Sequence, residues 1–390
     1  MKPGTARIEK FLGLRSDVDP ERMAIGDLIE ALNVRLDESG RAQRRPGRTS
    51  VLSGVTHSLW GDGERAFGVI GGALRRINAD YTTITLLSGL PGTPLHYEPL
   101  NERVYWTNGL QLGCIEGNTN RSWGLEVPPR IQATRVAGLL PAGRYQYTLT
   151  YMRADAQEGG AGLSNVIDLA ADSGLQIVAP TATDVTHAVL YLSKAGSEVM
   201  YRAAVIAAGA TGSYTNSGID LVSPLGTQHM SPPVPASAIA YHAGRMWLGV
   251  GDSVVPSAAF SPELFDYRAE LPVQGEVRML MPLRNGAGMF VGTSTHTAFL
   301  PGGDPAAMEL RPRHNEGVVA GALVYVPGKY FGEGKDEQDI PVWASPKGLY
   351  AGMSDGSVAS LTHKRHPLAL TGHGAGYFDE DLKTVLFSAA

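Results

Sequence analysis

The sequence predicts an all-β protein, and three observations indicate this class. It contains 48 glycines and 25 prolines but only 18% charged residues, a composition that favours short strands and tight turns over long helices. Short apolar runs recur along the chain, separated by turn residues such as Asn108-Gly109. Between two proline clusters the pattern changes to a tyrosine-rich segment of alternating polarity. The chain therefore combines at least two kinds of β unit.

The N-terminal part predicts one helical turn and one hairpin. Asp19–Met23 places a proline at the first helical position, which favours a short turn of helix. Leu32–Leu36 and about Arg41–Arg45 are expected as two strands, with the turn at Ser39-Gly40.

After this hairpin a unit of four strands repeats: two apolar strands around a turn, followed by more polar outer strands. In two later units, Gly249 and Gly292 lie about 43 residues apart, which is close to the length of a four-stranded propeller blade. Asn108-Gly109 predicts a type I′ turn within one unit, because both residues tolerate positive φ. Full units are expected to start near Val55, Leu95, Ala238, Val277 and Val318.

The last unit, Gly376–Phe387, has only two or three clear strands before the C-terminus. An incomplete sheet leaves unpaired backbone groups at its edge, so we expect the N-terminal hairpin to complete it. The sequence thus predicts a β-propeller of five or six blades. A set of stacked sandwiches without ring closure is the alternative.

A separate module is expected between Pro128-Pro129 and the cluster Ser231–Pro235. Its clearest strand is Gly143–Met152, where tyrosines and Leu149 alternate with Gln146 and two threonines. Further strands are expected at Asn165–Ala170, Gly174–Val178, Ala188–Ser193, Met200–Ala207 and Gly212–Asn216. The module resembles an immunoglobulin-like or fibronectin type III β-sandwich. The predicted organisation is 1–127 with the first blades, 128–235 as the insertion, and 236–390 with the remaining blades, closed by the N-terminal hairpin.

Charge and cysteine content restrict the class of protein. The formal net charge of −5 argues against electrostatic nucleic-acid binding as the main activity. The single cysteine, Cys114, excludes an internal disulfide and a multi-thiolate metal site, and its apolar surroundings predict a buried free thiol. There is no signal-peptide pattern and no apolar run of the roughly 18 residues that a membrane span requires. We expect a soluble protein without a membrane segment, made in a reducing cytoplasm.

No motif predicts catalysis or a cofactor. The chain lacks Gly-x-Ser-x-Gly and a phosphate-binding Lys-Ser/Thr loop. His363-Lys-Arg-His366 reads as a solvated charge run rather than a metal site, because two cations separate the imidazoles. Ser354-Asp-Gly-Ser357 partly resembles the Asp-box of sialidases, but its spacing differs and the tryptophan is missing. We therefore expect no enzyme activity, no cofactor and no bound metal.

The densest basic run is Arg41, Arg44, Arg45 and Arg48. Guanidinium groups suit both phosphates and acidic protein surfaces, so these four arginines are the candidate contacts to DNA or a partner protein. The alternative is a charged edge hairpin that resists aggregation.

Three features together resemble the tail hub or nozzle proteins of short-tailed bacteriophages. The first is Asn33–Gly40 followed by Arg44-Arg-Pro-Gly47, and the second is Tyr241–Gly249 with Phe260–Asp266. The third is a sandwich inserted into a propeller. The resemblance implies a structural virion protein of the tail, assembled as a ring, with a hexamer favoured, below the portal and adaptor. Its partners would be adaptor and other tail proteins, together with packaged DNA that passes through the channel without sequence-specific binding.

Two other classes stay open. One is a carbohydrate-binding or glycan-processing propeller with an accessory sandwich, which the missing signal peptide and disulfides disfavour. The other is a scaffold propeller that recruits protein partners inside a cell.

Overall fold

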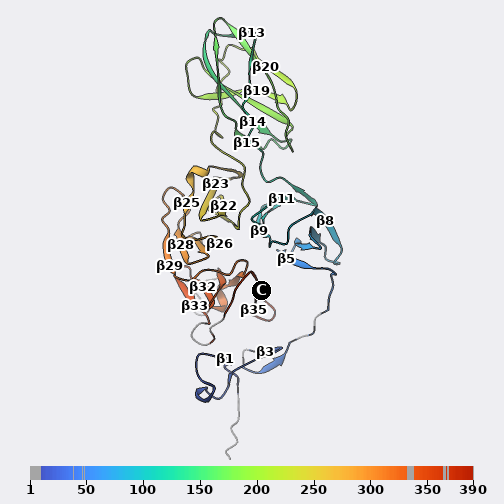
Figure 1. Ribbon diagram of the computed structural model, residues 1–390, viewed down its shortest axis with the longest axis vertical. Coiled ribbons are helices and arrows are strands. Elements are labelled where there is room, and N and C mark those ends of the chain that lie inside the picture. Colours follow the sequence, from blue (N-terminus) through green and yellow to red (C-terminus); the bar gives the residue numbers. More distant parts are fainter. Residues whose placement is uncertain are drawn as a thin grey trace, which may run out of the picture. The chain divides into compact units, whose positions relative to one another are not determined.

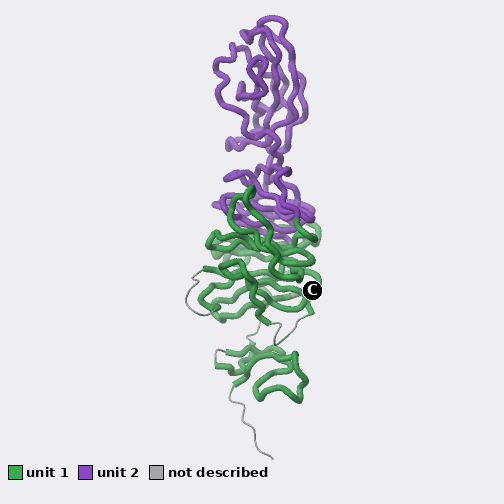
Figure 2. Tube along the Cα trace, turned by 90° about the vertical axis from the view of Figure 1, so that its left-hand side faces the viewer, with its two compact units in different colours: residues 1–94, 273–390 green, residues 95–272 purple. Residues whose placement is uncertain are grey.

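The computed structural model describes residues 10–37, 39–45, 47, 49–331, 338–362, 366 and 369–389. Strands dominate these residues (Figure 1), and helical structure within them is confined to three short 3-10 turns. The turns are η1 (Pro20–Arg22), η2 (Tyr267–Ala269) and η3 (Gly328–Tyr330). The all-β class is confirmed, and so is the helical turn expected at Asp19–Met23. The chain divides into unit 1, residues 1–94 with 273–390, and unit 2, residues 95–272 (Figure 2).

Among the described residues of unit 1, three antiparallel sheets have four strands each, with neighbours in sequence order. The first is β5 (Thr56–Gly61), β6 (Ala66–Ile70), β7 (Ala73–Ile77) and β8 (Thr83–Ser88). The second is β26 (Val277–Pro282), β27 (Gly288–Thr293), β28 (Thr297–Pro301) and β29 (Arg311–His314). The third is β30 (Leu323–Pro327), β31 (Asp339–Ser345), β32 (Gly348–Gly352) and β33 (Val358–Ser360).

Adjacent sheets of unit 1 share a core of large apolar side chains. Phe290 on β27 lies 5.5 Å from Trp343 on β31 and 5.0 Å from Phe299 on β28, measured between ring centroids. Met279 and Met281 of β26 pack in the same cluster. These strands are apolar on both faces because one face of each sheet covers the next sheet, which is how stacked blades bury their surfaces.

Three further sheets described in unit 1 have two strands each. The N-terminal hairpin pairs β3 (Val34–Leu36) with β4 (Ala42–Arg44), and the C-terminal hairpin pairs β34 (Gly374–Asp379) with β35 (Thr384–Ala389). The short strands β1 (Gly13–Leu14) and β2 (Asp27–Leu28) precede the N-terminal hairpin in the chain and pair with each other in parallel.

The N-terminal hairpin does not complete the last sheet, contrary to the sequence prediction. The hairpin is instead held by its own segment: the Phe11 N–H donates to the Gly40 carbonyl, and the Arg45 N–H donates to the Asn33 carbonyl. Its backbone bonds are thus local, and the last sheet keeps two strands within the described part of the chain.

Unit 2 contains two more meander sheets and the predicted module. One sheet is β9 (His96–Leu100), β10 (Arg103–Thr107), β11 (Leu112–Glu116) and β12 (Thr119–Arg121). The other is β21 (Ala238–His242), β22 (Arg245–Val250), β23 (Ser253–Ala258) and β24 (Ser261–Phe265), with β25 (Leu271–Pro272) also pairing with β23. Their starts, with those in unit 1, match the five predicted unit starts closely.

The segment between these sheets forms two sheets around one core. The smaller sheet consists of β13 (Thr134–Leu140), β17 (Ser173–Val178) and β20 (Thr211–Tyr214). The larger one consists of β14 (Gly143–Met152), β15 (Glu158–Ala161), β16 (Asn165–Leu169), β18 (His187–Ser193) and β19 (Met200–Ala207). Side chains of both sheets, such as Leu175 and Leu190, meet in one buried cluster. We call this segment the inserted module. Its predicted limits at 128 and 235 lie inside unit 2 and stay a prediction.

Two local predictions were wrong. Asn108 does not adopt positive φ, whereas Gly109 does, at φ 81°. The Asn108 carboxamide oxygen instead accepts from the Leu110 and Gln111 N–H groups. These side-chain hydrogen bonds form an Asx-type turn in place of the predicted type I′ turn. On β14 the expected polar face is also buried, because the Thr148 hydroxyl donates to the Gly162 carbonyl and the Thr150 hydroxyl donates to Glu158.

Candidate functional site

The predicted site residues lie on the exposed N-terminal hairpin. Arg44 ends β4, and Arg41 and Arg45 flank that strand; all three side chains are exposed. Arg48 lies outside the described residues. The hairpin turn is held by Asp37, whose carboxylate accepts from the Ser39 and Arg41 N–H groups at 2.9 Å. The three described arginines therefore project from a short, locally hydrogen-bonded hairpin.

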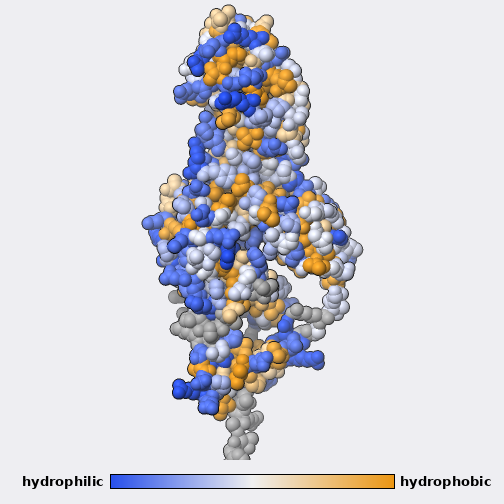
Figure 3. All heavy atoms as spheres, in the orientation of Figure 1, coloured by the Kyte–Doolittle hydropathy of each residue, from blue (hydrophilic) through white to orange (hydrophobic). Residues whose placement is uncertain are grey.

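Apolar side chains around this hairpin are also exposed. Leu32 is 73% exposed, and Ile25 and Ile29 are similarly open to solvent. In Figure 3 hydrophobic residues lie at the surface of the part of the chain that carries β1 and β3. These three exposed aliphatic residues fall within residues 25–32 of the chain.

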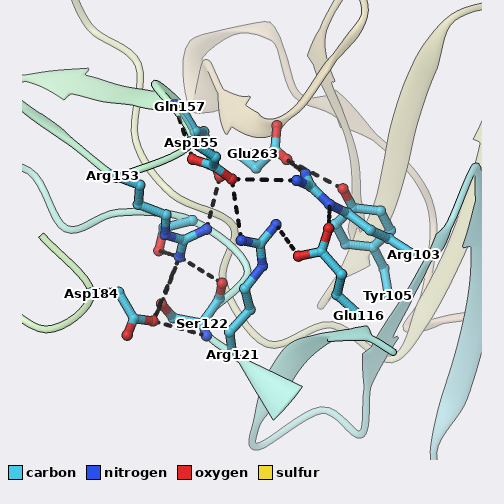
Figure 4. Close-up of polar contacts among 11 residues, drawn as sticks. Arg103, Tyr105, Glu116, Arg121, Ser122, Arg153, Asp155, Gln157, Asp184 and Glu263 are labelled. Carbon is cyan, nitrogen blue, oxygen red and sulfur yellow. Dashed lines mark hydrogen bonds and ion pairs between the residues drawn. The ribbon is translucent and has the colours of Figure 1, made fainter. Parts of the chain in front are cut away.

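A second cluster, which the sequence did not predict, lies inside unit 2 (Figure 4). Three guanidinium groups alternate with four carboxylates at the ends of several strands. We call it the arginine–carboxylate cluster; its members are Arg103, Arg121, Arg153, Glu116, Asp155, Asp184 and Glu263.

Arg103 begins β10 and contacts three carboxylates. Its Nη1 lies 3.2 Å from Glu263 Oε1 on β24, its Nε lies 3.3 Å from Glu116 Oε1, and its Nη2 lies 3.4 Å from Asp155 Oδ2. Arg121, at the end of β12, lies 3.0 Å from Glu116 and 3.2 Å from Asp155. Asp155 belongs to the loop between β14 and β15, so these two arginines connect the β9–β12 sheet to β24 and to the inserted module.

Arg153 is the most buried member, with only 5% of its surface exposed. Its Nη2 donates to the Ser122 carbonyl and hydroxyl oxygens, both at 2.7 Å, and its Nη1 donates to the Gln157 side chain at 2.8 Å. Asp184 lies 3.8 Å from Arg153 and accepts the Ser122 hydroxyl at 2.6 Å. Burial lowers the pKa of Arg153, as expected for a cation removed from water.

The two aspartates of the cluster are stabilised as anions. Hydrogen bonding from the Ser122 hydroxyl lowers the pKa of Asp184, and the nearby Arg153 and Arg121 lower it further. Burial alone would raise the pKa of Asp155, but the Gln157 N–H and Arg121 outweigh burial and lower it. With every guanidinium facing carboxylates, the cluster is suited to fixing the inserted module against two sheets rather than to binding an anion.

An aromatic core supports the cluster. Trp123 is fully buried, its ring centroid lies 4.9 Å from that of Tyr105, and its Nε1–H donates to the Pro262 carbonyl at 2.9 Å. Cys114 packs in the same core as a free thiol, as predicted, and burial raises its pKa to about 11. The arginine–carboxylate cluster thus lies beside a tightly packed apolar contact.

The sequence missed this cluster because its arginines are dispersed. Arg103 and Arg121 are 18 positions apart and Arg121 and Arg153 are 32 positions apart, whereas local charge density reveals only runs such as Arg41–Arg45. One signal was available: each of the three lies at or directly after a terminus of a strand. Among the residues described, no group of three or more His, Cys, Asp or Glu side chains is placed to hold a metal ion. In the same part of the chain, no helix is both long and apolar enough to span a bilayer.

Comparisons with known proteins find similar structures but assign the chain to no family. No protein-family model and no curated protein matches the sequence. A gluconolactonase from Xanthomonas campestris shares 11% identity at a TM-score of 0.34, covering 86% of this chain and 82% of its own. The Cps50 (Swd1) β-propeller domain from Myceliophteria thermophila shares 9% identity at a TM-score of 0.36, covering 88% and 98%. Virginiamycin B lyase from Staphylococcus aureus shares 7% identity at a TM-score of 0.34, covering 86% and 91%.

The chain spans 37% of the length of another similar structure, the extracellular domain of a protein from B. thetaiotaomicron described as a one-component system. That match has 11% identity, a TM-score of 0.34 and covers 86% of this chain. Similarity at these levels supports no statement about activity.

Proposed function

We propose that this protein is a structural, non-enzymatic component of a bacteriophage tail, and that it forms a ring-shaped hub or nozzle below the portal and adaptor. In this role it retains the packaged genome and later conducts it outward. Its place is the virion tail, its neighbours are adaptor and other tail proteins, and its ring is a hexamer.

One observation carries the proposal: the isolated chain combines exposed aliphatic side chains with a two-stranded last sheet among its described residues. The N-terminal segment exposes Ile25, Ile29 and Leu32, and none of its described residues between 10 and 53 has a buried large apolar side chain. The C-terminal sheet has two strands, whereas the meander sheets have four or more. Exposed aliphatic groups and unpaired strand edges are costly in a free protein and are expected in a subunit that is completed by assembly.

The motifs that resemble tail hub proteins occupy defined elements. Asn33–Gly40 and the following arginines span the hairpin β3–β4. Tyr241–Gly249 includes the turn between β21 and β22, where Ala243 and Gly244 adopt φ of 50° and 76°. Asp266 ends the second motif and accepts from the Arg268 N–H at the start of η2. Each motif therefore contains a specific turn together with parts of the strands beside it.

We further propose that the five meander sheets and the two-stranded sheet close into a propeller, and that the inserted module is an immunoglobulin-like or fibronectin type III-like sandwich. Successive antiparallel meanders support the first point. Two sheets packed over one apolar core support the second. The arginine–carboxylate cluster would then hold the sandwich in a constant position during ring assembly.

The charge of the chain is compatible with DNA passage. A formal net charge of −5 disfavours tight adhesion of DNA to a channel wall. The exposed Arg41, Arg44 and Arg45 are concentrated on one hairpin and are suited to a specific acidic contact.

The test is assembly. The purified full-length chain, alone and with its adaptor, should form rings with a central channel in electron micrographs and a multiple of the monomer mass by light scattering. Mass spectrometry of purified virions should detect the chain. A protein that remains monomeric at high concentration and with adaptor, and that is absent from virions, would contradict the proposal. Monomers that bind a glycan array would instead support the carbohydrate-binding alternative.

A further inference from the structure

The last sheet has one open edge. On the β34 side, the backbone of β30 leaves no space: a Cβ added at Gly376 would lie 2.6 Å from the Leu323 carbonyl oxygen. On the other side β35 pairs only with β34 among the described residues. The N–H and C=O groups at the free edge of β35 are therefore available to another strand.

The face beside this edge is also incomplete. Tyr377 on β34 and Leu386 on β35 are directly opposite each other, and they are 62% and 38% exposed. On the reverse face Val385 and Phe387 pack against β30–β33. An aromatic–aliphatic cross-strand pair normally stabilises a sheet by excluding water, which requires a cover on this face.

The N-terminal hairpin has the complementary properties. Its two strands pair with each other and with no other strand that the structure describes. Within the same described residues, the last sheet has two strands, whereas the meander sheets have at least four. The aliphatic side chains Ile29, Leu32 and Val34 lead into or lie on it and are exposed. Addition of this hairpin to β35 would restore a four-stranded sheet and cover apolar groups on both partners.

The charges of the two hairpins are opposite. Arg35, Arg41, Arg44 and Arg45 outnumber Asp37 and Glu38 in the N-terminal hairpin. In the turn of the C-terminal hairpin, Asp379, Glu380 and Asp381 outnumber Lys383. Glu380 already binds Lys329 at 3.0 Å, and Asp381 is exposed. Juxtaposed hairpins would thus attract each other, and like-charged pairing of two N-terminal hairpins is disfavoured.

We propose that β3–β4 of one copy adds to the free edge of β35 in the next copy, which links neighbouring subunits around the ring. The proposal rests on the proposed ring assembly. Exchange between copies is favoured over closure within a chain because, in the isolated chain, the described strands β3 and β4 form their own sheet and do not pair with β35. A repeated, directional contact of this kind closes only as a ring or extends as a filament.

Mixed cross-linking tests the exchange directly. Gln43→Cys and Ser388→Cys place single exposed thiols on β4 and β35 in separate preparations, while the native Cys114 is buried. After mixing and treatment with a short bismaleimide, we expect covalent dimers that contain one chain of each variant. Thr181→Cys, exposed on the inserted module, is the control partner for Gln43→Cys and should give no dimer.

Light scattering on the same samples separates this inference from the proposed function. Rings that form without the Gln43–Ser388 cross-link would overturn the exchange but leave the ring intact. In a variant that carries both Gln43→Cys and Ser388→Cys, a cross-link found only within single chains would also overturn the exchange. A chain that stays monomeric would contradict both proposals.

A charge swap gives an independent test. The double variant with Arg44→Glu and Arg45→Glu should need at least a tenfold higher protein concentration to assemble. Added salt should reduce this difference from the wild-type protein. Asp379→Lys with Asp381→Lys in the same chain should restore assembly. Failure of this reversal, with each variant folded by circular dichroism, would show that the two hairpins do not face each other.

Discussion

Thr107 and Ala236 form two reciprocal hydrogen bonds although 129 positions separate them. The Thr107 hydroxyl donates to the Ala236 carbonyl, and the Ala236 N–H donates back to the Thr107 oxygen, both at 2.9 Å. Both residues are buried. The chain leaves the β9–β12 sheet, passes through the inserted module and is joined again to the end of β10 at this point.

Replacement of Thr107 by valine should therefore destabilise the protein. The methyl group preserves the shape but leaves a buried N–H and C=O without partners, which costs about 1–3 kcal/mol. Urea unfolding monitored by tryptophan fluorescence measures the free energy. Thr119→Val, at an exposed position on β12, is the matched control and should change the stability by less than about 0.5 kcal/mol. Equal effects at the two positions would contradict this role of Thr107.

The arginine–carboxylate cluster predicts a large effect at Arg153. Arg153→Met removes charged hydrogen bonds to Ser122 and Gln157, so we expect a loss of about 1.5–3 kcal/mol in unfolding free energy. Arg268→Ala serves as the control, because that side chain is 65% exposed and its pair with Asp266 contributes at most about 1 kcal/mol. An Arg153→Met protein as stable as the control would show that the cluster does not hold the inserted module.

The cluster also predicts a pH dependence. The pKa values of Asp155 and Asp184 are lowered in the folded protein, so their stabilisation is present above the unfolded pKa of about 3.9 and is lost as the pH falls through the folded values. Asp184→Asn should lower the melting temperature at pH 7. The difference from the wild-type protein should narrow as the pH falls below about 4, because the unfolded carboxylate takes up a proton there while native Asp184 is still ionised, and it should be lost once the pH is below the lowered pKa of native Asp184. A difference independent of pH would contradict the assignment.

Gly352 predicts a packing effect in unit 1. A Cβ added there would overlap the fully buried Phe290 ring, which also contacts Trp343. Gly352→Ala should cost about 1–3 kcal/mol through displacement of these rings. Gly92→Ala is the control, since no atom lies within 4 Å of a Cβ at Gly92; its effect should be neutral or slightly stabilising, by up to about 1 kcal/mol. Differential scanning calorimetry compares the two variants.

Strand positions were predictable because they depend on local patterns. The alternation of Gly143–Met152 and the unit starts near Val55 and Ala238 are visible in windows of a few residues, and the observed strands agree with them. The burial of Thr148 and Thr150 was not predictable in this way, because period-2 alternation assigns polar residues to the solvent face. The pattern does not show that Gly162 accepts a hydrogen bond from Thr148 and that Glu158 accepts one from Thr150.

The two groups of arginines differ in the same way: one is visible in a short stretch of sequence, and the other depends on the fold. Arg41, Arg44 and Arg45 are adjacent in the chain, and an exposed hairpin displays them whatever its surroundings. Arg103, Arg121 and Arg153 form a cluster only because the ends of separate strands meet. Ion pairing between these strand ends depends on which carboxylates the fold brings within about 4 Å.

By itself, the sequence determined the all-β class, the approximate starts of the five meander units and the basic hairpin, since each follows from periodicity, turn residues or charge in short stretches. Only the tertiary structure decided that the N-terminal hairpin leaves the last sheet open and that Thr107 meets Ala236. The physical reason is that strand formation is driven by neighbouring residues, whereas edge pairing and buried polar contacts depend on distant segments that compete for the same hydrogen bonds.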